Sequence, residues 1–205
     1  MAAVAETDGR RVRGNATRRA ILSRAMQLAS TGGLEDLSIA QLAGDLGMSK
    51  SGLFAHFGSK EELQLSTIRA ARRVFSDEAV TPAMEAEPGL PRLRALLGAW
   101  FDYIGSDTFV GGCLLMEAAA EFDNRPGPVR DLIAETMAMW MSLLVEQAAV
   151  AVERGEIKAD PEQLAWELHA FGLGLNWDRQ LNESVDAVRR ARTAVATRLE
   201  LAQAA

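Results

Sequence analysis

Apolar residues recur at the three- and four-residue spacing of amphipathic helices along most of the chain, and glycine or proline separates the predicted helices. The first predicted helix covers about 15–31, where Gly32 and Gly33 end it. The longer helices that follow are predicted at about 60–80, 90–106, 113–122, 129–154, 161–182 and from 184 to the C-terminus. No segment has the apolar–polar alternation of a β-strand. The pattern therefore predicts an all-α protein of about nine helices, in which the helix from residue 60 ends before Pro82.

Residues 37–60 carry dense local signals for short helices. Ser38, Ser49 and Ser59 stand at positions that suit N-caps. Gly47 lies between the first two of these helices, where a sharp turn favours a residue that adopts positive φ. Helices this short are not stable alone, which favours a helix-turn-helix whose second helix enters the major groove of DNA. The alternative is a helical hairpin that serves only for packing.

The second short helix, at about 50–57, presents small and polar side chains. Its length of about 12 Å matches the width of the major groove, about 12 Å. Lys50 and Ser51 can hydrogen-bond a base edge or a phosphate. Gly52 has no side chain, so the helix backbone can approach the DNA closely there. Lys60 is expected at a helix N-terminus, which also favours a phosphate. The DNA-contacting residues predicted from the sequence are Arg13, Arg18, Ser38, Gln41, Ser49, Lys50, Ser51, Gly52, Phe54, His56 and Lys60.

The run GMSKSGLFAHFGSKEEL, at 47–63, resembles the signature of the tetracycline-repressor (TetR) family of bacterial regulators. The resemblance covers about 15–65. The matching positions are Gly47, Met48, Ser49, Leu53, Phe54, Phe57, Ser59, Lys60 and Glu61. Two positions depart from the family pattern. Phe54 stands where a tyrosine is usual, so the phenol that would contact a phosphate is absent, and Ser51 followed by Gly52 replaces the usual Gly followed by Ser or Thr.

The net charge of −6 is unevenly distributed along the chain. Residues 1–73 hold 11 Lys and Arg against 7 Asp and Glu, whereas residues 74–205 hold 11 against 21. A basic N-terminal part and an acidic remainder suggest that only the first meets phosphates. We expect residues 1–14 to form a disordered basic arm. The arm either gains phosphate contacts on DNA or serves as a solubilising tail.

The resemblance implies a helix-turn-helix domain at 15–60 and a ligand-binding and dimerisation domain at 61–205. It further implies that the last two helices pair across a two-fold axis as a four-helix bundle. The same apolar helices could instead close the core of one protomer, so both interpretations stay open. The predicted dimer-interface residues are Leu164, Leu168, Leu175, Val188, Val195 and Leu199.

Large, polarizable side chains are concentrated in a few helices of the second domain, which is typical of an apolar ligand pocket and also of an ordinary core. Glu117, Glu121, Asn176 or Asp178 are candidates for its polar edge. The predicted ligand-binding residues are Trp100, Tyr103, Met116, Met137, Trp140, Met141, Phe171 and Asn176.

Other chemistry finds little support in the sequence. The chain has two histidines, His56 and His169, and one cysteine, Cys113, which are too few for a His/Cys metal cage. No phosphate-binding glycine loop, nucleophile elbow or zinc helix motif is present. We therefore expect no metal, no cofactor and no enzymatic activity. Cys113 is interpreted as an inert buried thiol, with redox sensing as the alternative.

Location follows from the same composition. No apolar run approaches the roughly 20 residues that span a bilayer, and no signal peptide is visible. A single cysteine suits a reducing compartment. We expect a cytoplasmic protein without a membrane partner.

The resemblance implies a ligand-responsive transcriptional repressor that binds a palindromic double-stranded DNA operator as a homodimer. A small apolar or aromatic inducer would release it, with the helix at about 60–80 acting as a lever between the two domains. The alternative is a helical protein that binds or sequesters a small molecule and whose helix-turn-helix is only structural.

Overall fold

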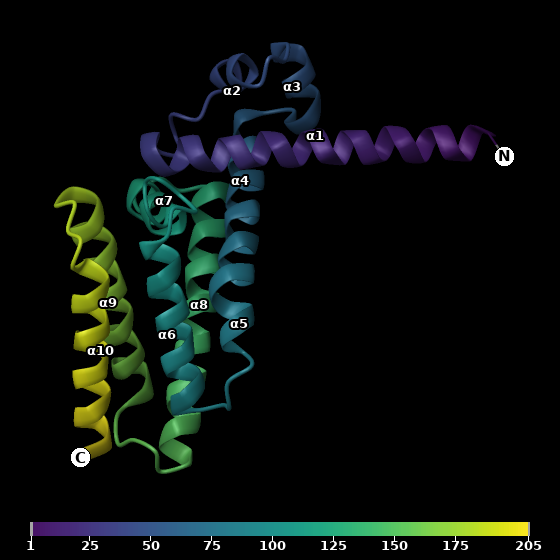
Figure 1. Cartoon of the computed structure of the whole chain (residues 1–205). Coiled ribbons are helices and arrows are strands. Elements are labelled where there is room, and N and C mark those ends of the chain that lie inside the picture. Colours follow the sequence, from purple (N-terminus) through teal and green to yellow (C-terminus); the bar gives the residue numbers. More distant parts are fainter. Residues whose placement is uncertain (1, 205) are drawn as a thin grey trace.

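The computed structural model describes the backbone of residues 2–204 and the side chains of residues 14–203. Every regular element in this range is helical, which confirms the predicted all-α class, and nine helices have seven residues or more. The helices within residues 2–57 form a head, which lies across one end of an elongated body formed by the helices within residues 60–204 (Figure 1). The elements are α1 (Ala2–Gly32), α2 (Ile39–Asp45), α3 (Lys50–Phe57), α4 (Lys60–Phe75), the π-helical segment η1 (Ser76–Val80), α5 (Thr81–Ala83), α6 (Leu90–Gly105), α7 (Leu114–Phe122), α8 (Pro128–Glu153), α9 (Pro161–Leu181) and α10 (Ala187–Ala204).

The head is built as the capping signals predicted. α2 and α3 lie on the outer side of α1, and α4 leaves on the side of the body (Figure 1). The side-chain oxygen of Ser38 accepts from the N–H of Gln41 at 3.1 Å, and those of Ser49 and Ser59 accept at 3.0 Å from the N–H three residues on. Gly47 has φ of +61° in the turn between α2 and α3. The three predicted N-caps are thus confirmed.

α1 begins at Ala2, earlier than the predicted start near residue 15. The side chains of the predicted basic arm, that of Arg13 among them, lie outside the described residues. The arm therefore stays a prediction.

The helix that leaves the head does not end before Pro82 as predicted. α4 runs into η1 and then α5, with Pro82 in the first turn of α5. A proline has no N–H and clashes with the carbonyl four residues earlier, but the first turn of a helix needs no such bond. The wider π-helical turn that precedes it lets the chain stay helical up to Ala83.

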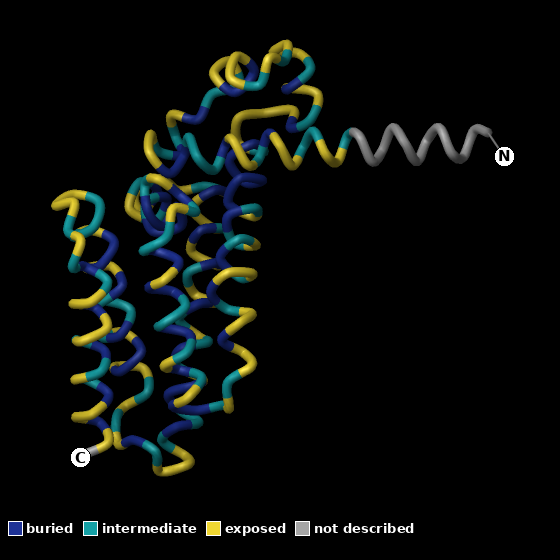
Figure 2. The backbone as a smooth tube through the Cα atoms, viewed as in Figure 1, coloured by how far each residue is buried: buried dark blue, intermediate teal, exposed yellow. Residues whose placement is uncertain are grey.

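The body packs α4, α6, α7 and α8 around an apolar core, and α9 and α10 lie side by side along α6 and α8 (Figure 1). Buried residues line the inward faces of these helices, and exposed ones face outward (Figure 2). Trp100 and Phe101 of α6 are among the largest fully buried side chains. α7 lies directly against α1, so one short body helix touches the head.

The residues predicted for the dimer interface instead belong to the core of the protomer. Leu164, Leu168 and Leu199 have no exposed surface, and Leu175 and Val195 are 3% and 7% exposed. Val188 is half-buried against the same core. For the five buried side chains, the prediction that they meet a partner is not supported by their position, because α9 and α10 turn them toward α6 and α8. For Val188 it stays a prediction.

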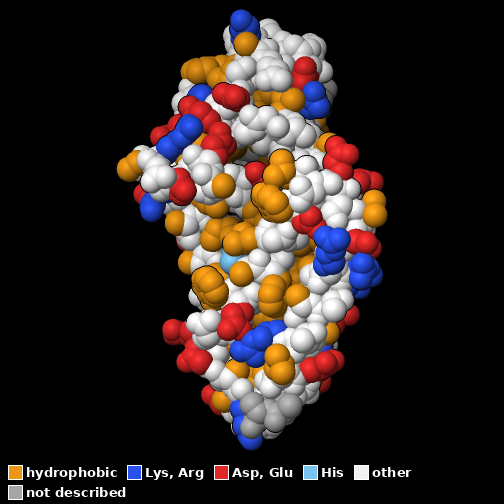
Figure 3. Space-filling view, turned by 90° about the vertical axis from the view of Figure 1, so that its left-hand side faces the viewer, with side chains coloured by type: hydrophobic (Ala, Val, Ile, Leu, Met, Phe, Trp, Pro, Cys, Tyr) orange, Lys and Arg blue, Asp and Glu red, His pale blue; other side chains and the backbone are white. Residues whose placement is uncertain are grey.

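The outward face of α9 carries a different apolar set. Trp166, Leu173, Trp177 and Leu181 are 46–65% exposed, although their side chains are large and apolar. Their spacing of seven, four and four residues places them on one side of the helix. On the face formed by α9 and α10, hydrophobic side chains gather across the middle, with charged ones toward both ends and along one edge (Figure 3). We call these four residues the α9 outer stripe.

Among the residues the structure describes, none of the helices combines the length and the apolar character that a bilayer crossing requires.

Candidate DNA-contacting surface and ligand cavity

α3 turns its polar side outward from the head. Leu53 and Phe57 are buried, whereas Lys50 and Ser51 are exposed and the side chain of Phe54 is half exposed. Lys50, Ser51 and Phe54 border one shallow hollow on the outer surface of α3. The helix therefore offers an ammonium group, a hydroxyl group and an apolar ring together, which can hydrogen-bond bases or phosphates and contact a thymine methyl.

Ser49, Ser38 and Gln41 stand at the edges of that surface. Ser49 is exposed, but its hydroxyl caps α3 and lies 3.2 Å from the hydroxyl of Ser51. The hydroxyl of Ser38 caps the N-terminus of α2, and the side chain of Gln41 is exposed beside it. Gly52 is half-buried next to the Ser49 cap. These residues position α2 and α3 as well as bordering the predicted contact surface.

Arg18 is engaged inside the head. Its guanidinium lies 4.4 Å from the ring centroid of Phe57, donates to the carbonyl oxygen of His56, and donates to the hydroxyl of Ser66 at 2.8 Å. Arg18 therefore holds the end of α3 against α1 and α4, a role that the sequence pattern did not reveal. The side chain of His56 is half-buried at the same end of α3.

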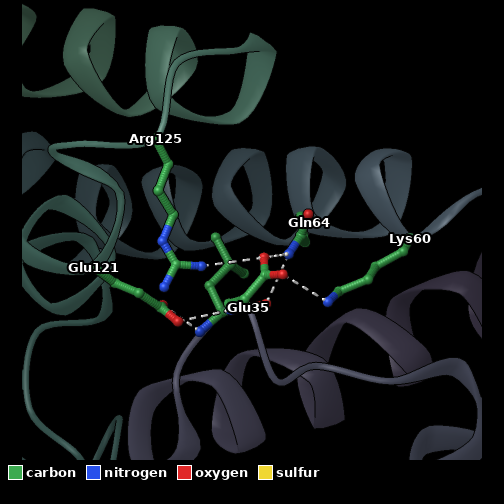
Figure 4. A network of polar contacts seen from close by, with 6 residues as sticks. Glu35, Lys60, Gln64, Glu121 and Arg125 are labelled. Carbon is green, nitrogen blue, oxygen red and sulfur yellow. Dashed lines mark hydrogen bonds and ion pairs between the residues drawn. The ribbon is translucent and has the colours of Figure 1, made fainter.

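Lys60 lies at the start of α4 in a polar network that joins head and body (Figure 4). Its ammonium group is 3.1 Å from a carboxylate oxygen of Glu35, and Gln64 donates to the other oxygen of that carboxylate at 3.1 Å. Hydrogen bonds from Lys60 and then Gln64 lower the pKa of Glu35. Arg125, just beyond α7, lies 3.7 Å from Glu35. Lys60 is half exposed, so a phosphate could exchange with Glu35 as its partner.

Glu121 of α7 completes this network from the side of the body. Its carboxylate accepts from the backbone N–H of Leu34 at 2.7 Å and of Glu35 at 3.0 Å (Figure 4). The loop between α1 and α2 is thus held to α7 by two charge-assisted hydrogen bonds. The expectation that Glu121 edges a ligand pocket is wrong, because its carboxylate is used at the head–body junction.

The other expected edge groups also lie away from the cavity. Glu117 accepts from the amide of Asn176 at 2.8 Å, and the oxygen of that amide accepts from the N–H of Cys113 at 3.0 Å. Asp178 accepts from Asn182 and lies 3.3 Å from Arg190. Asn176 therefore ties α9 to the start of α7, and the prediction that it binds the ligand is not supported by its position.

A cavity of about 450 Å³ lies between α4, η1, α6, α7 and α8. Four of the predicted ligand-binding residues line it: Trp100, Met116, Met137 and Trp140. Tyr103, Met141 and Phe171, like Asn176, are absent from its lining. Tyr103 lies one layer behind, with its ring centroid 5.5 Å from that of Phe75, which does line the cavity. Other lining residues not predicted include Ser76, Val80, Leu115, Thr136, Met139 and Leu143.

Three arginines of α4 also line this cavity, and the sequence interpretation missed them. Arg69, Arg72 and Arg73 lie at the exposed side of the helix beside its apolar interior. Their spacing of three and four residues, which places them on one helical face, was the signal that could have revealed them. The charged groups that line the cavity are therefore cationic, and not the carboxylates that were expected.

Cys113 and His169 have environments that suppress their charged forms. Burial raises the pKa of the Cys113 thiol, which lines the cavity, to about 11. The thiol is thus neutral at pH 7 and a poor nucleophile, which favours the inert interpretation. Burial lowers the pKa of His169, whose ring stacks on Trp100 with centroids 5.3 Å apart. In the described part of the chain, no three His, Cys, Asp or Glu side chains are grouped as metal ligands would be.

Comparison with known proteins agrees with this architecture. A family model described as "Tetracyclin repressor-like, C-terminal domain" matches residues 89–195, and one described as "Bacterial regulatory proteins, tetR family" matches residues 21–66. A search among curated proteins gave no significant match.

Solved structures share the fold over nearly the whole chain. A TetR transcriptional regulator from Chloroflexus aurantiacus J-10-FL has a TM-score of 0.84 at 23% identity, over 92% of this chain and 96% of that one. AibR in complex with isovaleryl coenzyme A and operator DNA has a TM-score of 0.70 at 22% identity, over 87% and 96%. A regulator from Saccharomonospora viridis in complex with choline has a TM-score of 0.74 at 21% identity, over 91% and 96%.

The second of these models covers the helix-turn-helix of the head, and the first covers most of the helical body and more than half of the chain. Proteins of this kind regulate transcription by binding DNA and are not enzymes. The chain belongs to the TetR family of bacterial transcriptional regulators.

Proposed function

We propose that the protein is a transcriptional repressor that binds a palindromic operator as a homodimer and is released by a small-molecule inducer. The observation that carries the proposal is the continuous path from α3 to the cavity. α3 presents Lys50, Ser51 and Phe54 outward, and α4, which starts three residues after α3 ends, lines the cavity with Arg69, Arg72 and Arg73.

Two-fold pairing follows from the size of α3. One recognition helix of eight residues reads only a few base pairs, and a dimer places a second one about 34 Å away. The α9 outer stripe supplies an apolar surface for that pairing. Two exposed tryptophans, Trp166 and Trp177, are side chains typical of the centre of an interface.

Release by an inducer is a population shift between two arrangements of the head and body. A ligand in the cavity contacts α4 and the start of α7, through residues such as Met116. The other end of α7 holds the loop between α1 and α2 through Glu121. A ligand that favours a different position of α4 or α7 therefore changes the orientation of α3 and the spacing between the two recognition helices.

The solved neighbours support this combination of partners. AibR was crystallised with isovaleryl coenzyme A and operator DNA, and the regulator from Saccharomonospora viridis with choline. We expect the protein to act in the cytoplasm, where its operator lies. The alternative, a binding or sequestering protein, lacks any need for the exposed polar face of α3.

A gel-shift titration against the DNA that flanks the protein's own gene tests the proposal. We expect a shifted band with two protomers per duplex, at a protein concentration far below that needed for unrelated DNA of the same length. Lys50→Ala should weaken the shift, whereas Lys158→Ala, at the far end of the body, should not. Equal affinity for flanking and unrelated DNA would favour the sequestering alternative.

A further inference from the structure

We propose that the inducer is an amphipathic anion, with an apolar body inside the cavity and a carboxylate or phosphate head against Arg69, Arg72 and Arg73. This inference rests on the proposed function, since it names the ligand class of the cavity through which release occurs. It replaces the purely apolar or aromatic inducer that the sequence suggested.

The interior of the cavity fits the apolar body. Trp100 and Trp140 pack with ring centroids 5.1 Å apart, and Phe75 meets Trp140 edge-on at 5.2 Å. Leu115 and Met116 of α7 close the same space. Its volume of about 450 Å³ lies within the range of small-molecule sites, roughly 300–1,000 Å³.

The mouth of the cavity carries more positive charge than its neighbours neutralise. Arg69 pairs with Glu62 at 3.1 Å and Arg72 with Glu135 at 3.8 Å, and these pairs are solvent-exposed. Neither carboxylate lines the cavity. Exposed pairs of this kind are weak and easily exchanged, so both arginines are available to a bound anion. Arg73 is exposed and has no ion-pair or hydrogen-bond partner among the described residues.

One buried donor on a residue of the cavity lining also lacks a partner. The indole nitrogen of Trp140 is buried and makes no hydrogen bond within the described part of the chain, and its ring is 5% exposed. Buried N–H groups are normally satisfied, so a missing partner in the wall of a cavity points to a ligand acceptor. The ligand class therefore includes a hydrogen-bond acceptor such as a carboxylate or carbonyl oxygen.

A second hollow extends the cationic region toward the head. Arg69 and Arg73 also border a space of about 530 Å³ between α1 and α4, together with Arg18, Arg19 and Asn15. Arg19 is exposed, and its side chain has no hydrogen-bond or ion-pair partner among residues 14–203. A head with several phosphate groups could therefore run from the cavity mouth to α1, whereas a carboxylate would stop at the mouth. Arg19 distinguishes these two sources of the anion.

The test is direct titration of the full-length protein, without DNA. The three probes share a ten-carbon chain and differ in their head group. Calorimetry measures binding of decanoate, decanoyl-coenzyme A and the neutral decanol. We expect at least one of the two anions to bind about tenfold or more tightly than decanol, and Arg73→Gln to weaken that anion about tenfold without weakening decanol. Arg130→Gln, an exposed arginine of α8 outside the cavity lining, is the matched control.

The same titrations distinguish a phosphate-bearing head from a carboxylate head. If the phosphate-bearing head is correct, Arg19→Gln weakens decanoyl-coenzyme A and leaves decanoate unchanged; if the carboxylate is correct, decanoate binds and Arg19→Gln has no effect. Decanol binding as tightly as both anions, no binding of any probe, or anion binding that ignores Arg73→Gln would overturn the inference. Failure of operator binding would instead overturn the proposed function, because these titrations contain no DNA.

Discussion

Replacing Glu121 with alanine removes the carboxylate that holds the loop between α1 and α2 to α7. The wild-type carboxylate accepts from the N–H of Leu34 at 2.7 Å and of Glu35 at 3.0 Å. It also lies against Gly33, where a Cβ would approach its oxygen to 2.9 Å. Alanine leaves both N–H groups without this partner and opens a gap at the head–body junction.

The size of the effect follows from these two bonds. Hydrogen bonds to charged groups contribute about 1.5–3 kcal/mol each where they are buried. Glu121 is half-buried and Leu34 is 1% exposed, so water can replace one bond more easily than the other. We therefore expect a loss of about 2 kcal/mol at the junction, which is roughly a 30-fold shift toward its open form.

Hydrogen exchange reports this opening at the residues concerned. The amides of Leu34 and Glu35 should exchange about 30-fold faster in Glu121→Ala than in the wild type. Glu121→Gln should give a smaller increase, because its amide keeps one acceptor. Glu153→Ala, an exposed carboxylate at the end of α8, is the control and should leave both amides unchanged.

Operator titrations with and without inducer then connect the junction to function. Glu121→Ala should bind the operator more weakly without inducer and respond less when inducer is added, because α7 no longer holds the α1–α2 loop. Wild-type exchange at both amides, together with an unfolding free energy within about 0.5 kcal/mol of the wild type, would refute the role assigned to Glu121.

Three further predictions address the recognition helix, the dimer and the buried thiol. Lys50→Ala should lower operator affinity. If Lys50 contacts a phosphate, the slope of log affinity against log salt should fall by about 0.9 for each protomer, or about 1.8 for a dimer, measured by fluorescence anisotropy at several salt concentrations. Trp177→Glu should convert the proposed dimer to a monomer in sedimentation, because it places a charge in the α9 outer stripe; an unchanged dimer would exclude that surface. Cys113 should resist alkylation at pH 8 in the folded protein and react once the chain is unfolded. Since burial raises its pKa from about 9 to about 11, its contribution to stability should decline as the pH rises through this interval, relative to Cys113→Ala.

Local patterns predicted the head well because its structure is determined by nearby residues. Ser38, Ser49 and Ser59 each cap a helix through an N–H three residues on, and Gly47 turns the chain with positive φ. These interactions span a few residues, so the sequence alone is enough to place them. The exposed side of α3 followed from the same short segment.

The sequence of α9 did not show which of its faces packs against the core of the protomer. Apolar residues occur on both sides of this helix: Leu164 and Leu168 face the core, and Trp166 and Trp177 face outward. Helical periodicity identifies faces but does not tell which one meets the protomer and which one meets a partner. The correct assignment requires the packing of α9 against α6 and α8.

The cavity mouth and the junction depend on contacts between distant segments. Glu121 meets Leu34 across 87 positions of sequence, and no local pattern pairs them. Arg69, Arg72 and Arg73 resemble an ordinary solvated face of α4 until α8 is placed beside them. Trp100 and Trp140 were predicted from side-chain type alone, which identifies large apolar residues but not the space between them.

Hydroxyl-radical footprinting of the operator tests the central claim most directly, namely that two copies of α3 enter successive major grooves on one face of DNA. The account predicts two protected stretches whose centres lie about 10 base pairs apart, and their loss in Lys50→Ala. A single protected stretch, or two that lie on opposite faces of the duplex, would contradict it.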